Sequence, residues 1–169
     1  MEDTLKIYKL LISNNLQESL FVSKYGIELF NFLSKQAFEK ANGRCAGCGH
    51  EPPAHIKETH LYFHIYKINK TNPELSEGVT LCKLCHATQH IENSIKSNLV
   101  LFVNSVFDQN QLIRLTRKEQ IQGELNQRKI VKLKKSPEKF LEEWHSGEAE
   151  FTPTLKVIFT SNFIIDDLY

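Results

Sequence analysis

Two short cysteine pairs constrain this chain more than any other feature. Cys45 and Cys48 form one C-x-x-C motif, Cys82 and Cys85 form a second, and the sequence holds no other cysteine. Each pair places two thiolates one turn apart, which suits a tetrahedral ion with Zn–S bonds of about 2.3 Å. Four unrelated buried cysteines would not repeat one spacing, and no βαβ pattern supports a redox pair. The sequence therefore predicts one structural Zn²⁺ held by all four thiolates.

Composition and the N-terminus indicate a compartment in which thiols stay reduced. The chain has 169 residues, of which 41% are hydrophobic and 24% charged, as in one globular domain with extensions. The N-terminus lacks the basic region and apolar core of a signal peptide. The longest apolar run, 99–103, is far shorter than the ~20 residues of a membrane helix. We therefore expect an intracellular protein of the cytoplasm or nucleoid with no membrane partner, where a metal is favoured over two disulfides.

Hydrophobic periodicity and turn residues predict an α+β fold with a helical N-terminus, a central zinc unit and a mixed α/β C-terminal region. The expected helices cover 4–41, a segment that begins at Lys83, 117–128 and 137–146. The expected strands cover 59–66, 79–81, 129–134 and 155–160, while 99–107 fits either state. The expected divisions are a helical segment at 1–42, a four-cysteine zinc unit at 43–98 and a C-terminal extension at 99–169.

The order of knuckle, strand, loop, strand, knuckle and helix is typical of a treble-clef zinc finger with an inserted β-hairpin. Three stretches carry this order, namely FEKANGRCAGCG, LYFHI and VTLCKLCHATQH, within residues 38–91. They resemble the HNH endonuclease family, whose ββα-metal unit often lies on a four-cysteine zinc site. The resemblance implies a metal-dependent hydrolase that acts on phosphodiester bonds, with nucleic acid as its partner and DNA favoured over RNA.

The resemblance also implies positions for the catalytic site. His64 matches the first metal ligand, and His86 and His90 match the closing ligands, four apart on one helix face. These three imidazoles resemble the three-histidine site of the colicin nucleases and would hold a second divalent ion, Mg²⁺, Mn²⁺, Ni²⁺ or Zn²⁺. Ile65 stands where the family has its general-base histidine, and Glu77 stands where it has the asparagine that orients that base and pins the loop.

The missing base leaves alternatives open. His60, Tyr62, His64 and Tyr66 alternate along one face of the expected strand. His60 or Tyr66 is therefore a candidate substitute for the missing base. A register shifted by one residue would instead make His64 the base and place Phe63 at the first ligand position. The chain is thus expected to be an endonuclease with an atypical site. If the site has instead decayed, Ile65→His, alone or with Glu77→Asn, is expected to restore some cleavage. The alternatives are an inactive zinc module that binds nucleic acid or recruits a protein, and an unrelated zinc scaffold.

Charge is concentrated near the C-terminus. Residues 111–140 carry nine basic and three acidic side chains, whereas 141–169 carry one and six. The two segments either neutralise each other or separate into a phosphate-binding face and an acidic tail. The predicted nucleic-acid contacts are Arg114, Arg117, Lys118, Arg128, Lys129, Lys132, Lys134 and Lys135.

Two further features have weaker functional interpretations. The acidic C-terminal end, which closes in Leu168 and Tyr169, resembles the tail motifs that dock into DNA sliding clamps and suggests a protein partner. The remaining histidines have no matched position in the family motif. They are interpreted as loop, surface or packing residues, namely His50, His55, His60 and His145.

Overall fold

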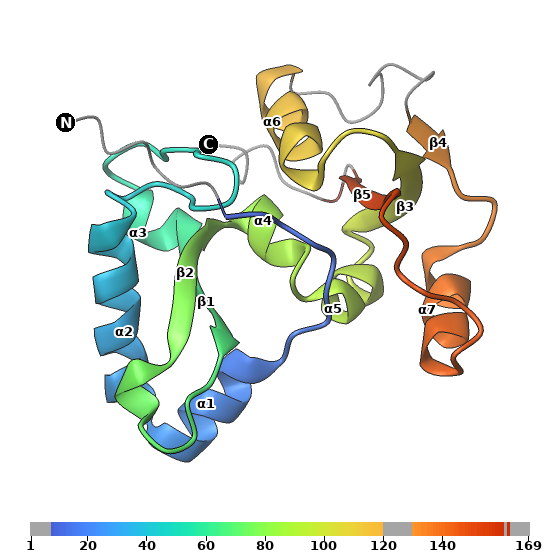
Figure 1. Ribbon diagram of the computed structural model, residues 1–169. Helices are drawn as coiled ribbons and strands as arrows, with labels where there is room; N and C mark the ends of the chain where they lie inside the picture. The colour runs from blue at the N-terminus through green and yellow to red at the C-terminus, as the bar shows by residue number, and fades with distance from the viewer. Residues whose placement is uncertain (1–7, 120–129, 161, 163–169) are drawn as a thin grey trace. The chain divides into compact units, whose positions relative to one another are not determined.

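The computed structural model describes residues 8–119, 130–160 and 162, and confirms the α+β fold class (Figure 1). The helices of the described part are α1 (Gln17–Tyr25), α2 (Ile27–Lys40), α3 (Lys57–His60), α4 (Lys83–Ala87), α5 (Ile91–Lys96), α6 (Gln109–Glu119) and α7 (Pro137–His145), with one 3₁₀ turn at Pro73–Leu75. The strands are β1 (Leu61–Lys67), β2 (Glu77–Cys82), β3 (Val100–Ser105), β4 (Ile130–Lys132) and β5 (Leu155–Phe159). None of the described helices is long and apolar enough to cross a membrane.

The chain divides into two compact units at a boundary that differs from the expected ones. The first unit holds residues 15–86 together with the described residues before 10, and the second holds 10–14 and the described residues from 87 onward. The N-terminal helices and the zinc unit are therefore one body and not separate segments, because α1 and α2 pack on the β1–β2 hairpin. Each unit is described by itself below.

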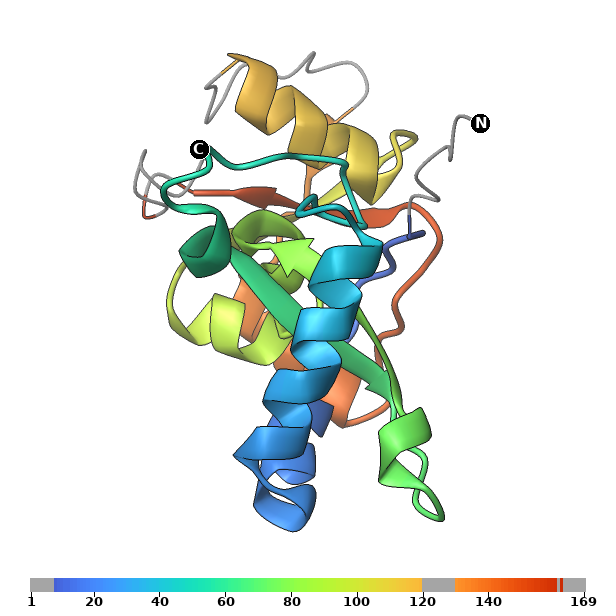
Figure 2. The same cartoon turned by 90° about the vertical axis from the view of Figure 1, so that its left-hand side faces the viewer.

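In the first unit, an antiparallel hairpin lies against two helices (Figure 2). Gly26, with φ of 92°, makes the turn between α1 and α2 that lets both helices reach the same strands. The buried centre of this packing is formed by residues from α1, α2 and β1, namely Phe21, Leu33, Phe63 and Ile65. Alternation along β1 places Phe63 and Ile65 in this core, which turns His64 to the other face of the strand.

Gly78 in β2 lies opposite Ile65 and leaves room for the ring of Phe63. A Cβ at this position would lie 2.4 Å from Phe63 Cε2 and 2.7 Å from the backbone oxygen of His64. Because the second contact is to backbone, it cannot be relieved by a side-chain rotation. Gly78 therefore fixes the close approach of β2 to the strand that carries His64.

We expect Gly78→Ala to lower the free energy of unfolding by about 1–3 kcal/mol, the usual cost of overpacking a core. Chemical denaturation followed by circular dichroism measures this change. Glu77→Ala is the matched control in the same strand, since Glu77 is half exposed and pairs with Lys67 at 3.3 Å, an interaction worth at most about 1 kcal/mol. Equal stability of the two variants would contradict the close packing at Gly78.

The second unit contains a three-stranded antiparallel sheet in the order β4-β3-β5. Gln109 at the start of α6 is buried and ties the helix to β5, because its side chain donates to the Val157 carbonyl (2.8 Å) and accepts from the Val157 N–H (2.9 Å). Ser136 caps α7 as the sequence predicted, accepting from the Lys139 N–H at 3.2 Å. The rings of Phe102 and Phe140 pack 4.6 Å apart between β3 and α7.

Several predicted elements are confirmed, and others need correction. The structure contains the expected strands near 59–66, 79–81, 129–134 and 155–160 and the expected helix near 137–146, each with shifted ends. The segment 99–107, which fitted either state, contains the strand β3. The described residues 8–16 of the expected N-terminal helix are not helical, since several of their backbone groups bond to other segments instead. Of the helix expected at 117–128, residues 117–119 lie in α6, which begins earlier at Gln109, and 120–129 lie outside the described residues.

Candidate metal centres

The four cysteines converge as the sequence predicted. Their sulfur atoms all lie within 4.8 Å of one another, and the Sγ atoms of Cys48 and Cys82 are 3.7 Å apart. A disulfide would need about 2.05 Å, whereas ligands on a tetrahedral ion with 2.3 Å bonds lie about 3.8 Å apart. All four cysteines are buried and none of them forms a disulfide, and the arrangement fits a metal ion such as zinc.

The two knuckles have the same local geometry. The Cys48 N–H donates to Cys45 Sγ at 3.4 Å, and the Cys85 N–H donates to Cys82 Sγ at 3.5 Å. The first knuckle is joined to β2 by the Ala46 N–H, which donates to the Thr80 carbonyl at 2.8 Å. The second knuckle runs from the last residue of β2 into α4. The cluster therefore fastens the open end of the hairpin to the turn after α2.

The electrostatics of the cluster favour a cation. Burial raises the pKa of the Cys45 and Cys85 thiols well above the ordinary value, while a hydrogen bond from Cys45 lowers the pKa of Cys48. Several thiolates cannot be charged together in such a site unless a cation compensates them. A divalent metal would displace the thiol protons and supply this compensation.

A second cluster in the first unit joins Glu18, His64 and His86. His64 Nδ1–H donates to Glu18 Oε1 at 2.8 Å, and His86 Nε2–H donates to the same oxygen at 3.1 Å. The His64 side chain is fully buried, while the Glu18 and His86 side chains are 15% and 24% exposed. Helix α1, strand β1 and helix α4 thus each direct one polar side chain to a common point. Two of the three residues are predicted site residues.

Packing fixes the two imidazoles. The ring of Tyr62 stacks on that of His86, with centroids 5.3 Å apart and planes 8° apart. The rings of His64 and His86 meet edge to face at 5.8 Å. Tyr66 stacks instead on Tyr8 at 5.5 Å. Tyr62 therefore holds the ring of His86 in its orientation, a role that the sequence did not predict.

His90 does not share a helix face with His86. Helix α4 ends at Ala87, and His90 precedes α5 with φ of −127° and ψ of 59°, which is not a helical conformation. The predicted continuous helix is therefore wrong in this segment. His90 belongs to the second unit, where it forms a β-bridge with Asn14.

The positions expected to hold a base and its orienting residue have other roles. Ile65 is fully buried in the hydrophobic core on the opposite face of β1 from His64. Glu77 is exposed and pairs with Lys67. The loop between the strands is pinned by Asn69, whose Oδ1 accepts from the N–H groups of Thr71 (3.1 Å) and Asn72 (2.9 Å).

The remaining histidines are structural or exposed. His60 lies in α3, not in the strand, and its Nδ1 is 3.2 Å from the Ile56 carbonyl, so it is not part of the His64 face. His50 contributes its backbone carbonyl to the first knuckle, where it accepts from Cys45 N–H at 2.8 Å. His55 is exposed, and the His145 side chain is half exposed, 3.8 Å from Glu92.

The predicted basic residues occupy several elements of the second unit. Arg114, Arg117 and Lys118 lie on α6, Lys132 ends β4, and Lys134 and Lys135 precede α7. Lys135 forms an ion pair with Glu143, so part of this charge is neutralised locally. Arg128, Lys129 and the acidic C-terminal end from 163 onward lie outside the described residues.

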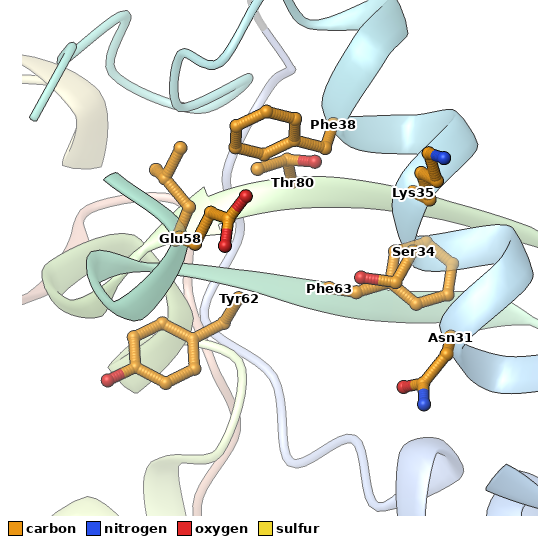
Figure 3. Close-up of a pocket in the computed structure, with 9 residues that line it drawn as sticks. Asn31, Ser34, Lys35, Phe38, Glu58, Tyr62, Phe63 and Thr80 are labelled. Carbon is orange, nitrogen blue, oxygen red and sulfur yellow. The ribbon is translucent and has the colours of Figure 1, made fainter. Parts of the chain in front are cut away.

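A pocket of about 230 Å³ lies between α2, α3 and the hairpin of the first unit (Figure 3). Its one lysine and one glutamate give it mixed polarity, but it contains no histidine or cysteine, so it adds no donor to either metal cluster. The lining residues are Asn31, Ser34, Lys35, Phe38, Glu58, Leu61, Tyr62, Phe63 and Thr80.

Comparisons with protein-family models, curated proteins and solved structures gave no match to this chain. Functional inference therefore depends on the residues themselves.

Glu18 is the residue that sequence reasoning missed. It lies 46 positions before His64 and outside the matched stretch 38–91, so no local spacing links it to the histidines. Only the packing of α1 against β1 brings it to the site. A single acidic residue in an expected helix does not indicate a contact with distant histidines.

Proposed function

We propose that this chain is a zinc-stabilised, HNH-like protein that binds nucleic acid and hydrolyses phosphodiester bonds at a second divalent ion. The observation that carries the proposal is the convergence of His64 and His86 beside a four-cysteine cluster, on a strand–strand–helix unit. The order of these parts matches the resemblance seen in the sequence. Imidazole nitrogen is a suitable ligand for Zn²⁺, Ni²⁺ and related ions.

Each residue of the first unit has a defined task in this proposal. The four cysteines hold a structural zinc and thereby fix the end of β2 against the knuckle after α2. His64 and His86 hold the second ion, and Tyr62 keeps the His86 ring in its orientation. When bound, such an ion stabilises developing charge on a phosphoryl group and activates water. His90, four residues after His86, is proposed as a further ligand from the sequence spacing.

Nucleic-acid binding would involve the basic residues of the second unit. Lys and Arg contacts to phosphate are independent of sequence and weaken with salt. Arg114, Arg117 and Lys118 on α6 supply three such cations within one helix. DNA remains the favoured nucleic acid, and the acidic C-terminal end remains the proposed contact for a protein partner.

A second candidate function is an inactive nucleic-acid-binding module. The burial of Ile65 favours it, because the strand then offers no imidazole at the expected base position. General-base assistance contributes about 10²–10⁴-fold to rate, so a site without a substitute would be slow.

Nicking of supercoiled plasmid DNA with added Mg²⁺, Mn²⁺, Ni²⁺ or Zn²⁺ tests the proposal. We expect His64→Ala and His86→Ala each to lower the nicking rate at least about 100-fold, since even outer-shell changes at metal sites cost 10–100-fold. His55→Ala is the control, because His55 is exposed.

The other outcomes separate the candidates. DNA binding without nicking by the natural protein would favour the inactive module. Nicking that survives both histidine substitutions would place the chemistry elsewhere in the chain.

A further inference from the structure

We infer that Glu18 is a metal ligand, so that the first unit binds its second divalent cation through a carboxylate as well as the imidazoles of His64 and His86. This inference rests on the metal site of the proposed function and adds a donor from outside the strand–strand–helix unit. It changes the expected donor set from histidines alone to histidines with a carboxylate.

The distances fit a shared ion. Glu18 Oε1 lies 2.8 Å from His64 Nδ1 and 3.1 Å from His86 Nε2. Donor atoms on one ion with bonds of 2.0–2.1 Å lie about 2.9–3.4 Å from one another, for octahedral or tetrahedral angles. The two Glu18 distances therefore already fit a shared ion, and each of the three residues offers a donor atom within 4.8 Å of those of the others.

The start of α1 is held against the strand that carries His64. The Asn15 side chain donates to the Ile65 carbonyl at 3.3 Å, and the Gln17 side chain donates to the Tyr66 carbonyl at 3.0 Å. Phe21, one turn after Glu18, is fully buried in the core. Because these contacts lie on both sides of Glu18 along the chain, the carboxylate is placed at the imidazoles by the fold and not by a chance surface rotamer.

The burial and charge of the cluster also favour a cation. A carboxylate that is 15% exposed beside a fully buried imidazole has lost most of its hydration, which is costly unless the charge is compensated. A divalent ion would compensate the charge of the carboxylate and form direct bonds to all three donors. Two imidazoles with one carboxylate form the donor set of several hydrolytic zinc sites and of non-haem iron sites.

This donor set predicts the metal. Mg²⁺ and Ca²⁺ prefer all-oxygen coordination, so two nitrogen ligands favour Zn²⁺, Ni²⁺, Fe²⁺ or Mn²⁺ over them. The selectivity follows from the residues of this chain and does not require that the site be catalytic.

Calorimetric titration of the zinc-loaded full chain with Mn²⁺ and Ni²⁺ tests the inference. We expect one site beyond the structural zinc, and we expect Glu18→Gln to weaken binding at least about 100-fold while glutamine keeps the size of the side chain. Glu28→Gln is the matched control, because Glu28 is an exposed glutamate in the first turn of α2. It should bind as the natural protein does.

The remaining variants separate this inference from the proposed function. If Glu18→Gln binds within threefold of the natural protein while His64→Ala and His86→Ala lose binding, Glu18 is not a ligand and the histidine site stands. If the histidine variants also bind normally, the proposed site fails as well. No second-site binding by the natural protein overturns both. Glu18→Asp, which keeps the charge but retracts the carboxylate, replaces Glu18→Gln if the latter does not fold, and is expected to weaken binding at least tenfold.

Discussion

Cys85→Ala is expected to release the zinc and unfold the first unit. Cys85 is completely buried, and its sulfur lies within 4.8 Å of the other three. Loss of one thiolate would leave three ligands for the proposed metal, which would join the first knuckle to the end of β2 together with the hydrogen bond from the Ala46 N–H to the Thr80 carbonyl. Structural zinc contributes apparent binding free energies of about 10–16 kcal/mol in finger peptides, which is comparable to the whole stability of a typical domain.

Zinc content by mass spectrometry and thermal unfolding by circular dichroism measure this outcome. The natural protein should carry at least one zinc per chain after mild purification. Ala41→Ser is the matched control, since it changes another small buried residue of the same unit, at the end of α2. A folded Cys85→Ala protein that keeps its zinc would require a different ligand set, and a folded natural protein without zinc would contradict the structural role of the metal.

Local signals predicted much of the fold. The C-x-x-C spacing predicted the sulfur cluster correctly, because it is a short-range pattern whose geometry varies little. Asn42 and Gly43, with φ of 53° and 65°, end α2 as expected from their tolerance of left-handed backbone. Ser136 and Pro137 start α7 for the same kind of local reason.

Long-range packing accounts for what the sequence did not predict. Residues 8–16 have apolar side chains at helical spacing, yet their backbone bonds to distant segments, as when the Ser13 N–H donates to the Thr88 carbonyl at 3.1 Å. Tertiary contacts of this kind override local propensity. Because such contacts cannot be read from local sequence, the sequence did not predict that Glu18 contacts His64, 46 positions away. It also did not predict the break between α4 and α5.

In the proposed HNH-like site, two residues would take over the tasks of the asparagine that the resemblance implies. The position that matches it, Glu77, points to Lys67 at the surface. Asn69 pins the loop through its own side chain, and Glu18 contacts the imidazole of His64 from another helix. Under the proposed function, one of these tasks would be met locally and the other by packing, so a missing motif residue does not by itself indicate a lost site.

This arrangement reverses the expectation for Ile65→His. We now expect that substitution to destabilise the first unit by about 3–5 kcal/mol and to restore no cleavage. Ile65 is fully buried with Phe21, Leu33 and Phe63. An imidazole in its place would lose apolar packing and would bury polar nitrogens among hydrocarbon groups.

Denaturant unfolding and the plasmid nicking assay, run on the same preparations, measure both effects. Ile65→Val is the matched control, which keeps the shape and costs about 0.5–1.5 kcal/mol. Strand alternation points residue 65 away from Glu18 and His86, so the new imidazole could reach a bound water only if β1 shifted its register by one residue. Such a shift would also bring His64 into the core and remove it from Glu18. A stable Ile65→His variant that gained nicking activity would therefore show that the His64 face is not the metal face.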